Sequence, residues 1–183
     1  MKKITYALIL SIFMFLCSTQ TVHAKPRLDV LQKGGFVDLS TEDMKDTVKA
    51  LVEKISKDQD LSFVPAVSCY DWPGSSTLAY NTLITKTICV NLSGFRDDVD
   101  ATAAGETVEY HLVKTVAHEV RHSYQYEHQF DDSDYGKACL NNFNNRVSYN
   151  GYNLAEYNAQ FTEADADAYA IEYADKFFEK VKK

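Results

Sequence analysis

Residues 107–129 constrain the fold of this chain most, because their apolar side chains recur every four residues. The spacing predicts one helix over this range, with an apolar face that packs against a core. That face carries Val108, Leu112, Val116, Val120 and Tyr124. The other face carries His118 and His122, with Glu119 beside them, in the order H-E-x-x-H. The same helix therefore offers both a packing face and a candidate metal site.

Four-residue spacing on a helix places two side chains about one turn apart on the same face. The imidazoles of His118 and His122 can therefore converge on one ion. Glu119 would stand close enough to accept a proton without being a ligand. Gln125, one turn after His122, could brace the site and Arg121 could pair with a nearby carboxylate, but the favoured interpretation makes both surface residues of this helix. A catalytic zinc site needs three protein ligands and one open position, so a third ligand must come from elsewhere in the chain.

A second helix, predicted from about residue 154 to 181, offers this third ligand. Its predicted packing stripe is Phe161, Ala164, Ala168, Ile171 and Phe178. Glu163 and Asp167 stand four residues apart on a face roughly opposite. If the two helices lie antiparallel, Glu163 would complete a His2Glu site, and Asp167 would hold a ligand imidazole by its second nitrogen. Two alternatives stay open: Glu156, two turns before Glu163, as third ligand, and His111 as a ligand in place of the carboxylate.

The motifs HEVRHSYQ and, later, EADADAYA resemble those of the gluzincin metallopeptidases. In that family H-E-x-x-H lies on one helix and E-x-x-x-D on a later one. The chain looks especially like the compact bacterial H-E-x-R-H-x-x-Q proteins and the ImmA/IrrE-type peptidases, over residues 107–175. The resemblance implies a small zincin-like α+β domain in which His118, His122 and Glu163 hold one zinc ion.

By the same resemblance, Glu119 would be the general base for hydrolysis of a peptide or protein substrate by a metal-activated water. Asp167 or Asp165 would orient a ligand. No motif identifies the side chain that stabilises the oxyanion of such a reaction. The candidates for this role are Tyr149, Tyr152, Tyr157 and His111.

Residues 1–24 predict a secretory signal peptide. They open with two lysines, continue with an apolar run too short to cross a bilayer, and end on the small-x-small sequence VHA. Cleavage there would leave residues 25–183 as one secreted or periplasmic domain without a membrane anchor. The net charge of −7 argues against nucleic acid and anionic membranes as partners.

The middle of the chain predicts the β part of an α+β fold. Residues 40–58 have the spacing of a packing helix, and residues 61–95 are rich in strand-forming side chains, enough for two to four strands. Pro65 would place its own strand at a sheet edge. The strand within residues 87–94 is expected to form another edge, on which an extended peptide can lie. The Asn- and Tyr-rich residues 131–153 are expected to form a loop.

The cysteines favour one disulfide. Export would permit disulfides, and Cys69 and Cys89 both lie in the strand-rich half. Closing this loop would contribute about 3 kcal/mol in the chain-entropy model. Cys139 is left without an assigned partner.

Two other functions compete with a peptidase. One is a secreted, non-catalytic zinc-binding or toxin-like interaction module on a zincin fold, against which the intact Glu119 argues. The other is a metal-free interaction domain, which a large separation between Glu163 and His118 would favour.

Overall fold

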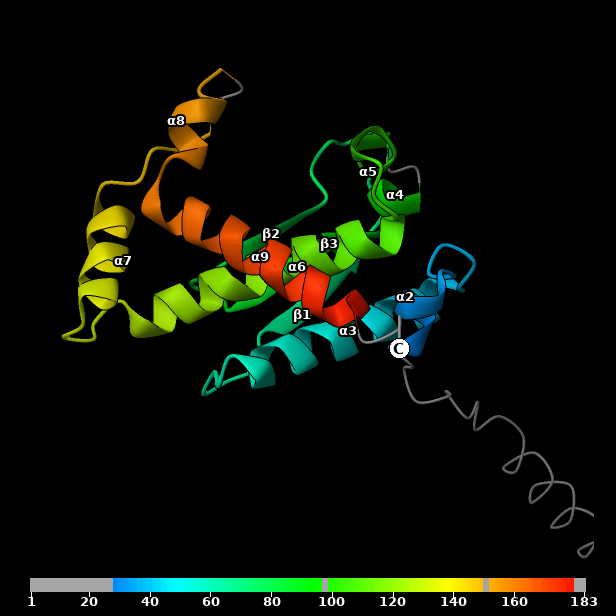
Figure 1. Cartoon of the computed structure of the whole chain (residues 1–183), viewed down its shortest axis with the longest axis horizontal. Coiled ribbons are helices and arrows are strands. Elements are labelled where there is room, and N and C mark those ends of the chain that lie inside the picture. The colour runs from blue at the N-terminus through cyan, green and yellow to red at the C-terminus, as the bar shows by residue number, and fades with distance from the viewer. Residues whose placement is uncertain (1–27, 97–98, 150–151, 180–183) are drawn as a thin grey trace, which may run out of the picture.

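The computed structural model describes residues 28–96, 99–149 and 152–179, and the predicted signal peptide, residues 1–24, lies outside them. The described residues form one small α+β domain (Figure 1). Its helices are α2 (Asp29–Lys33), α3 (Thr41–Asp58), α4 (Leu92–Arg96), α5 (Val99–Ala104), α6 (Val108–His128), α7 (Asp134–Asn144), α8 (Leu154–Asn158) and α9 (Phe161–Glu179). Its strands are β1 (Ala66–Tyr70), β2 (Ala79–Thr82) and β3 (Thr87–Asn91). No helix in this part of the chain has the length and apolar character needed to span a membrane.

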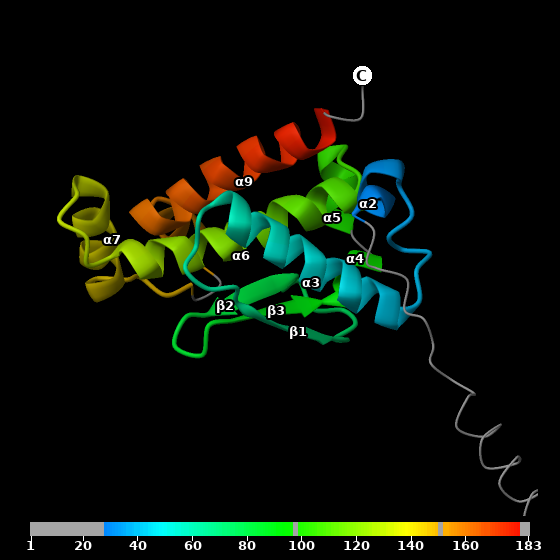
Figure 2. The same ribbon diagram turned by 90° about the horizontal axis from the view of Figure 1, so that it is seen from below.

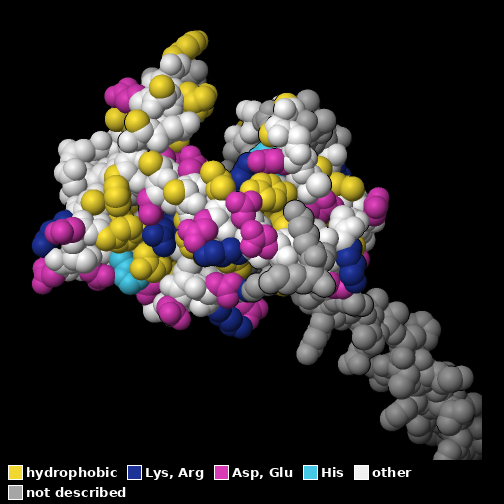
Figure 3. All heavy atoms as spheres, in the orientation of Figure 1, with side chains coloured by type: hydrophobic (Ala, Val, Ile, Leu, Met, Phe, Trp, Pro, Cys, Tyr) yellow, Lys and Arg dark blue, Asp and Glu magenta, His cyan; other side chains and the backbone are white. Residues whose placement is uncertain are grey.

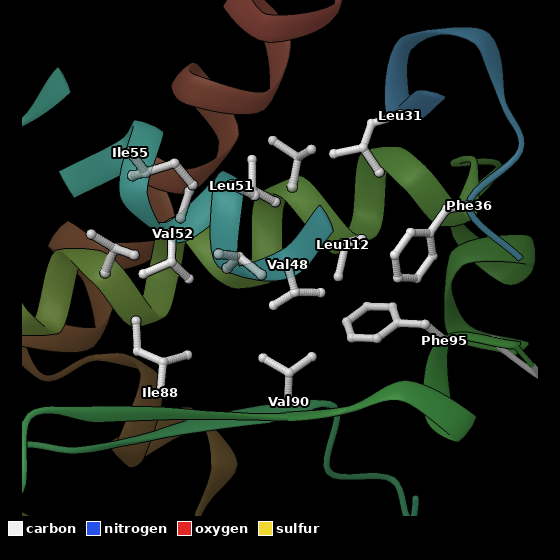
Figure 4. Packing of buried hydrophobic residues seen from close by; sticks show 14 of the residues in the cluster. Leu31, Phe36, Val48, Leu51, Val52, Ile55, Ile88, Val90, Phe95 and Leu112 are labelled. Atoms are coloured by element: carbon white, nitrogen blue, oxygen red, sulfur yellow. The ribbon is translucent and has the colours of Figure 1, made fainter. Parts of the chain in front are cut away.

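Helix α3 forms as the sequence predicts. Ser40 caps its N-terminus, because the Ser40 Oγ accepts a hydrogen bond from the Asp43 backbone N–H at 3.1 Å. Its fully buried apolar face consists of Met44, Val48, Leu51, Val52 and Ile55. Figure 4 shows Val48 facing Val90 of β3, so this face packs on the sheet.

The sheet has the order β1-β3-β2, with β1 parallel and β2 antiparallel to β3. Strand β1 lies at an edge, as the preceding Pro65 predicts. The prediction of a free edge within residues 87–94 is wrong, because β3 is the central strand. A short turn pairs Thr82 with Thr87 and folds β2 back along one side of β3, while β1 occupies the other. The edge next to α6 therefore belongs to β2.

The fold has three layers (Figure 2). Helices α3 and α6 cover one face of the sheet, and α9 packs on α6 from the side away from the sheet. Because α6 is enclosed on both sides, it buries polar as well as apolar side chains. The buried polar ones are Glu109, Glu119, His122, Ser123 and Gln125. Each of them needs a partner in the interior, since an unpaired buried polar group is costly.

Helix α9 meets α6 through small side chains. The stripe it buries is Glu163, Ala166, Ala170, Ala174 and Phe177. The predicted stripe is wrong except at Phe178, which is half-buried against the core. Phe161 and Ile171 are 40% and 50% exposed, and Ala164 and Ala168 are exposed as well. Alanine side chains let the two helices approach closely, since the distance between packed helices depends on the side chains at the contact. Glu163 consequently lies on the face that meets α6, not on the opposite face.

The last helix also begins later than predicted, because a turn separates α8 from α9. Two hydrogen bonds of 2.8 and 2.9 Å join the Gln160 side-chain amide to the backbone of Val147. The Asn142 Oδ1 accepts the backbone N–H of Thr162 at 2.8 Å and caps the start of α9. These contacts hold the turn, and they leave Glu156 on α8, a separate helix.

Part of the predicted 131–153 loop is helical. Helix α7 begins after Ser133, whose Oγ accepts a hydrogen bond from the Gly136 backbone N–H at 3.0 Å. Its sequence is polar, and only Gly136, Cys139 and Asn142 are buried among its residues. Such a short buried stripe gives a weak helical pattern, which explains why the sequence did not predict it.

The predicted disulfide between Cys69 and Cys89 is wrong, because Cys69, Cys89 and Cys139 are all free. The strand register pairs Cys69 with Val90 and Ser68 with Cys89. Neighbouring residues of a strand point to opposite faces of the sheet. Cys69 therefore shares the core face with Val90, and Cys89 lies on the other face.

Candidate metal centre

Helices α6 and α9 bring three candidate ligand atoms together. His118 Nε2 and His122 Nε2 are 3.0 Å apart, and Glu163 Oε2 lies 3.4 and 3.5 Å from them. Ligands in a tetrahedral shell with bonds of about 2.0–2.1 Å stand about 3.3–3.4 Å apart. The three residues therefore form a group that could hold a metal ion, and no other such group occurs among the described residues.

The two alternative ligands lie outside this group. Glu156 is exposed on α8 and does not line the pocket beside the three ligands. His111 lies two turns before His118 on α6, where its ring stands edge-on to Phe95 at 6.2 Å. Of the two carboxylates considered for the third position, the structure places Glu163 at the histidines.

Asp167 orients the first histidine. Its Oδ1 lies 2.8 Å from Nδ1 of His118. A proton on Nδ1 satisfies this contact and leaves the Nε2 lone pair directed at the ligand group. Because Asp167 follows Glu163 by one helical turn, α9 supplies both the third candidate ligand and the partner that fixes the His118 ring.

Gln125 orients the second histidine. Its Oε1 lies 2.8 Å from Nδ1 of His122, and its Nε2 donates to the Thr162 carbonyl and to Asp165, both at 2.8 Å. The amide oxygen can only accept, so Nδ1 of His122 must be the donor. Nε2 of His122 is then free to bind a cation. Gln125 is 0% exposed, so these contacts lie in the protein interior.

Asp165 contacts neither histidine, although the sequence made it a candidate for orienting a ligand. Its carboxylate instead accepts hydrogen bonds from Gln125 and from the Arg121 guanidinium on α6, and from the Tyr135 hydroxyl on α7. Burial opposes ionisation, but these donors lower the pKa of Asp165 below its ordinary value. Asp165 is thus a charged anchor that joins three helices and reaches His122 through Gln125.

If the group binds zinc, Gln125→Ala is expected to weaken that binding by about 10–100-fold, because His122 would lose the acceptor that sets its tautomer and ring orientation. Competition with a chromophoric chelator measures this change. Gln129→Ala is the matched control, since Gln129 lies beyond the end of the same helix and its amide donates to the Tyr126 carbonyl. Equal zinc affinity of the two variants would contradict the role of Gln125.

The charges of the group favour a cation at its centre. Burial alone would lower the pKa of His118, but hydrogen bonds to Asp167 and Glu163 raise it to about 10. Burial likewise opposes ionisation of Glu163, yet hydrogen bonds from both histidines lower its pKa well below the ordinary value. Without a metal, His118 therefore carries a proton opposite the Glu163 carboxylate, and a bound cation would replace that positive charge.

Glu119 lies beside the ligands in a pocket of about 130 Å³. Burial raises the pKa of the Glu119 carboxyl, although the charges of His122 and His118 act in the opposite direction. The raised pKa is nearer the range suited to a general base. Asn81 of β2 donates to the Glu119 carbonyl at 2.7 Å and to Ser123 Oγ at 2.8 Å. These bonds fix the edge strand to α6 and make β2 one wall of the pocket.

Only one of the four candidates for the oxyanion donor, Tyr157, lines this pocket. Phe143 and Arg146 line it beside Tyr157. Burial and the negative charge of Glu163 raise the pKa of Tyr157, so its hydroxyl keeps its proton at neutral pH. Tyr149 and Tyr152 are 56% and 97% exposed and do not line the pocket. His111 lines a second cavity, of about 410 Å³, that also borders His118 and Asp167.

We compared the chain with models of known protein families, with curated proteins and with solved structures. None of them matches it. The resemblance to gluzincins therefore stays a prediction based on two motifs, and function is inferred from the geometry of the site.

The sequence did not identify every residue that shapes this site. The favoured interpretation placed Gln125 and Arg121 on the helix surface, but they connect His122 to Asp165. The alternative that Gln125 braces the site came from its place one turn after His122, on the same side of the helix. Asn81 and Arg146 approach from distant segments, and their polar surroundings carry no periodic pattern that would reveal them.

Proposed function

We propose that this chain is an exported zinc peptidase with one small zincin-like domain. The observation that supports this most is the tetrahedral spacing of His118, His122 and Glu163 in a pocket that also contains Glu119. Two histidines and one glutamate are a known ligand set of catalytic zinc, and three ligands leave one position open. The apolar first segment of the chain supports export.

Each residue of the pocket has a role in this proposal. Zinc, when bound, supplies Lewis-acid chemistry that lowers the pKa of water and polarises a carbonyl group. Glu119 accepts a proton from the attacking water and returns it to the leaving amine. Tyr157 donates a hydrogen bond to the carbonyl oxygen as negative charge develops on it. The outer edge of β2, which pairs with no described strand, can bind an extended substrate through its backbone groups.

The test measures metal and cleavage together. The purified protein is expected to contain about one zinc ion per chain, and to cleave members of a mixed peptide library. A chelator should abolish cleavage, and added zinc should restore it. His118→Ala, purified in parallel, should contain no zinc and cleave nothing. Zinc in the wild-type protein without cleavage of any peptide would support the non-catalytic binding module instead.

A further inference from the structure

Arg146 places a positive charge in the metal pocket. It lies between α7 and α8, its side chain is 45% exposed, and it lines the pocket with Glu119 and Glu163. Its Nη2 stands 3.6 Å from Glu163 Oε1, on the carboxylate oxygen that is not directed at the histidines, and 3.4 Å from the Tyr157 hydroxyl. The guanidinium is therefore next to the candidate metal position and open to solvent.

The hydrogen-bonding capacity of this guanidinium is largely unused. Arginine has five N–H donors. Among the described residues, only Tyr157 accepts a hydrogen bond from Arg146, and that bond is long at 3.4 Å. The neighbouring Val147 is held by the two hydrogen bonds to Gln160, which fix the backbone next to Arg146 against the start of α9. The backbone beside Arg146 is thus held at the pocket, while most donors of its side chain are available to a ligand.

The charge balance of the pocket makes that ligand an anion. The ionisable side chains that line it are the two carboxylates, the two histidines, Arg146, Tyr80 and Tyr157. A divalent ion would balance Glu119 and Glu163, and the charge of Arg146 would remain uncompensated. This excess is local, since the chain as a whole carries a net charge of −7. A planar guanidinium binds a carboxylate through two parallel hydrogen bonds.

We propose that Arg146 binds a carboxylate of the peptide substrate close to the bond that is cut. This inference rests on the proposed peptidase function and names the substrate class: peptides with a free C-terminal carboxylate, or with an acidic side chain, beside the cleavage site. The pocket volume of about 130 Å³ favours the terminal carboxylate. Pockets that enclose a drug-sized ligand measure about 300–1,000 Å³, so this one suits the end of a chain better than a longer segment.

The experiment measures binding without cleavage. Zinc-loaded Glu119→Gln protein is titrated with three peptides of one parent sequence: a free acid, a C-terminal amide, and an amide with an acidic residue at the end. The free acid is expected to bind about tenfold or more tightly than the plain amide, because a hydrogen-bonded charge pair is lost in the amide. Tight binding of the acidic amide alone would assign the carboxylate to a side chain.

In the Glu119→Gln protein, a second substitution, Arg146→Gln, should remove the preference for the free acid. Arg146→Lys should retain part of that preference, since lysine keeps the charge without the paired donors. Lys137→Gln is the matched control, because Lys137 is an exposed cation of α7 whose Nζ binds the Asp132 carbonyl outside the pocket. Zinc content and thermal unfolding show whether each variant is folded and loaded. No preference for any carboxylate, or a preference that survives Arg146→Gln, would overturn the proposal.

Cleavage kinetics separate this proposal from the proposed function. If wild-type protein cleaves peptides but Arg146→Gln lowers kcat equally for acids and amides, Arg146 acts on the oxyanion and the carboxylate proposal fails while the peptidase stands. If wild-type protein cleaves nothing and the Arg146-dependent preference is still measured, the peptidase fails and the carboxylate site stands.

Discussion

Glu119→Gln is expected to lose peptide cleavage by at least about 100-fold while keeping its zinc, since general-base catalysis contributes about 10²–10⁴-fold. Glutamine has nearly the same shape as glutamate, but it cannot accept the proton from the attacking water. The contact that ties β2 to α6 survives, because Asn81 binds the backbone carbonyl of residue 119. The measurements are the rate of cleavage of the best library peptide and the zinc content of the same sample.

Glu127→Gln is the matched control for this change. Glu127 lies two turns further along α6, where its carboxylate accepts the Ser62 backbone N–H. Its loss of charge should leave both cleavage and zinc content close to those of the wild type. Cleavage by Glu119→Gln at the wild-type rate would show that another group is the base.

Glu163→Ala is expected to lower zinc affinity more than Gln125→Ala does. Loss of a residue that orients a ligand lowers metal affinity roughly 10–100-fold, and Glu163→Ala removes a ligand itself. Glu156→Ala, which removes the other carboxylate considered for this position, should bind zinc as the wild type does. The structure predicts this difference because Glu163 Oε2 faces both histidines, whereas Glu156 is exposed on α8. Zinc titration in the presence of a competing chelator compares the two variants.

Thermal unfolding of the metal-free variants provides the control for this comparison. Glu163 is buried, so its truncation could also disturb the packing of α9 on α6. A folded Glu163→Ala protein with wild-type zinc affinity would exclude Glu163 as a ligand, and a loss of zinc in Glu156→Ala would make Glu156 the third ligand.

The sequence predicted those parts of the fold that depend on local periodicity. The α3 and α6 helices follow from apolar side chains at helical spacing, and Pro65 correctly indicated an edge strand. Spacing also placed His118 with His122, and Glu163 with Asp167, on one face of their helices. That these two faces meet was an expectation that assumed antiparallel helices, and it left Glu156 as an alternative third ligand.

The parts that depend on contacts between distant segments were not predicted. The edge strand next to α6 is β2 because β2 and β1 pair with opposite sides of β3. The sequence of β3 does not indicate which neighbour pairs with which side. The stripe of α9 was misplaced because alanines, which score low as apolar residues, form its contact with α6. The cysteine pair failed for a similar reason, since only the register of β1 on β3 shows that Cys69 and Cys89 face opposite ways.

The close contact of α6 and α9 has a mechanical consequence. The candidate ligands come from both helices, so a cation bound to them would cross-link two segments about forty residues apart in the chain. Cys69, Cys89 and Cys139 form no such link, because all three are free. For a small domain that we propose to be exported, the cation would then take the place that disulfides hold in many secreted proteins of this size.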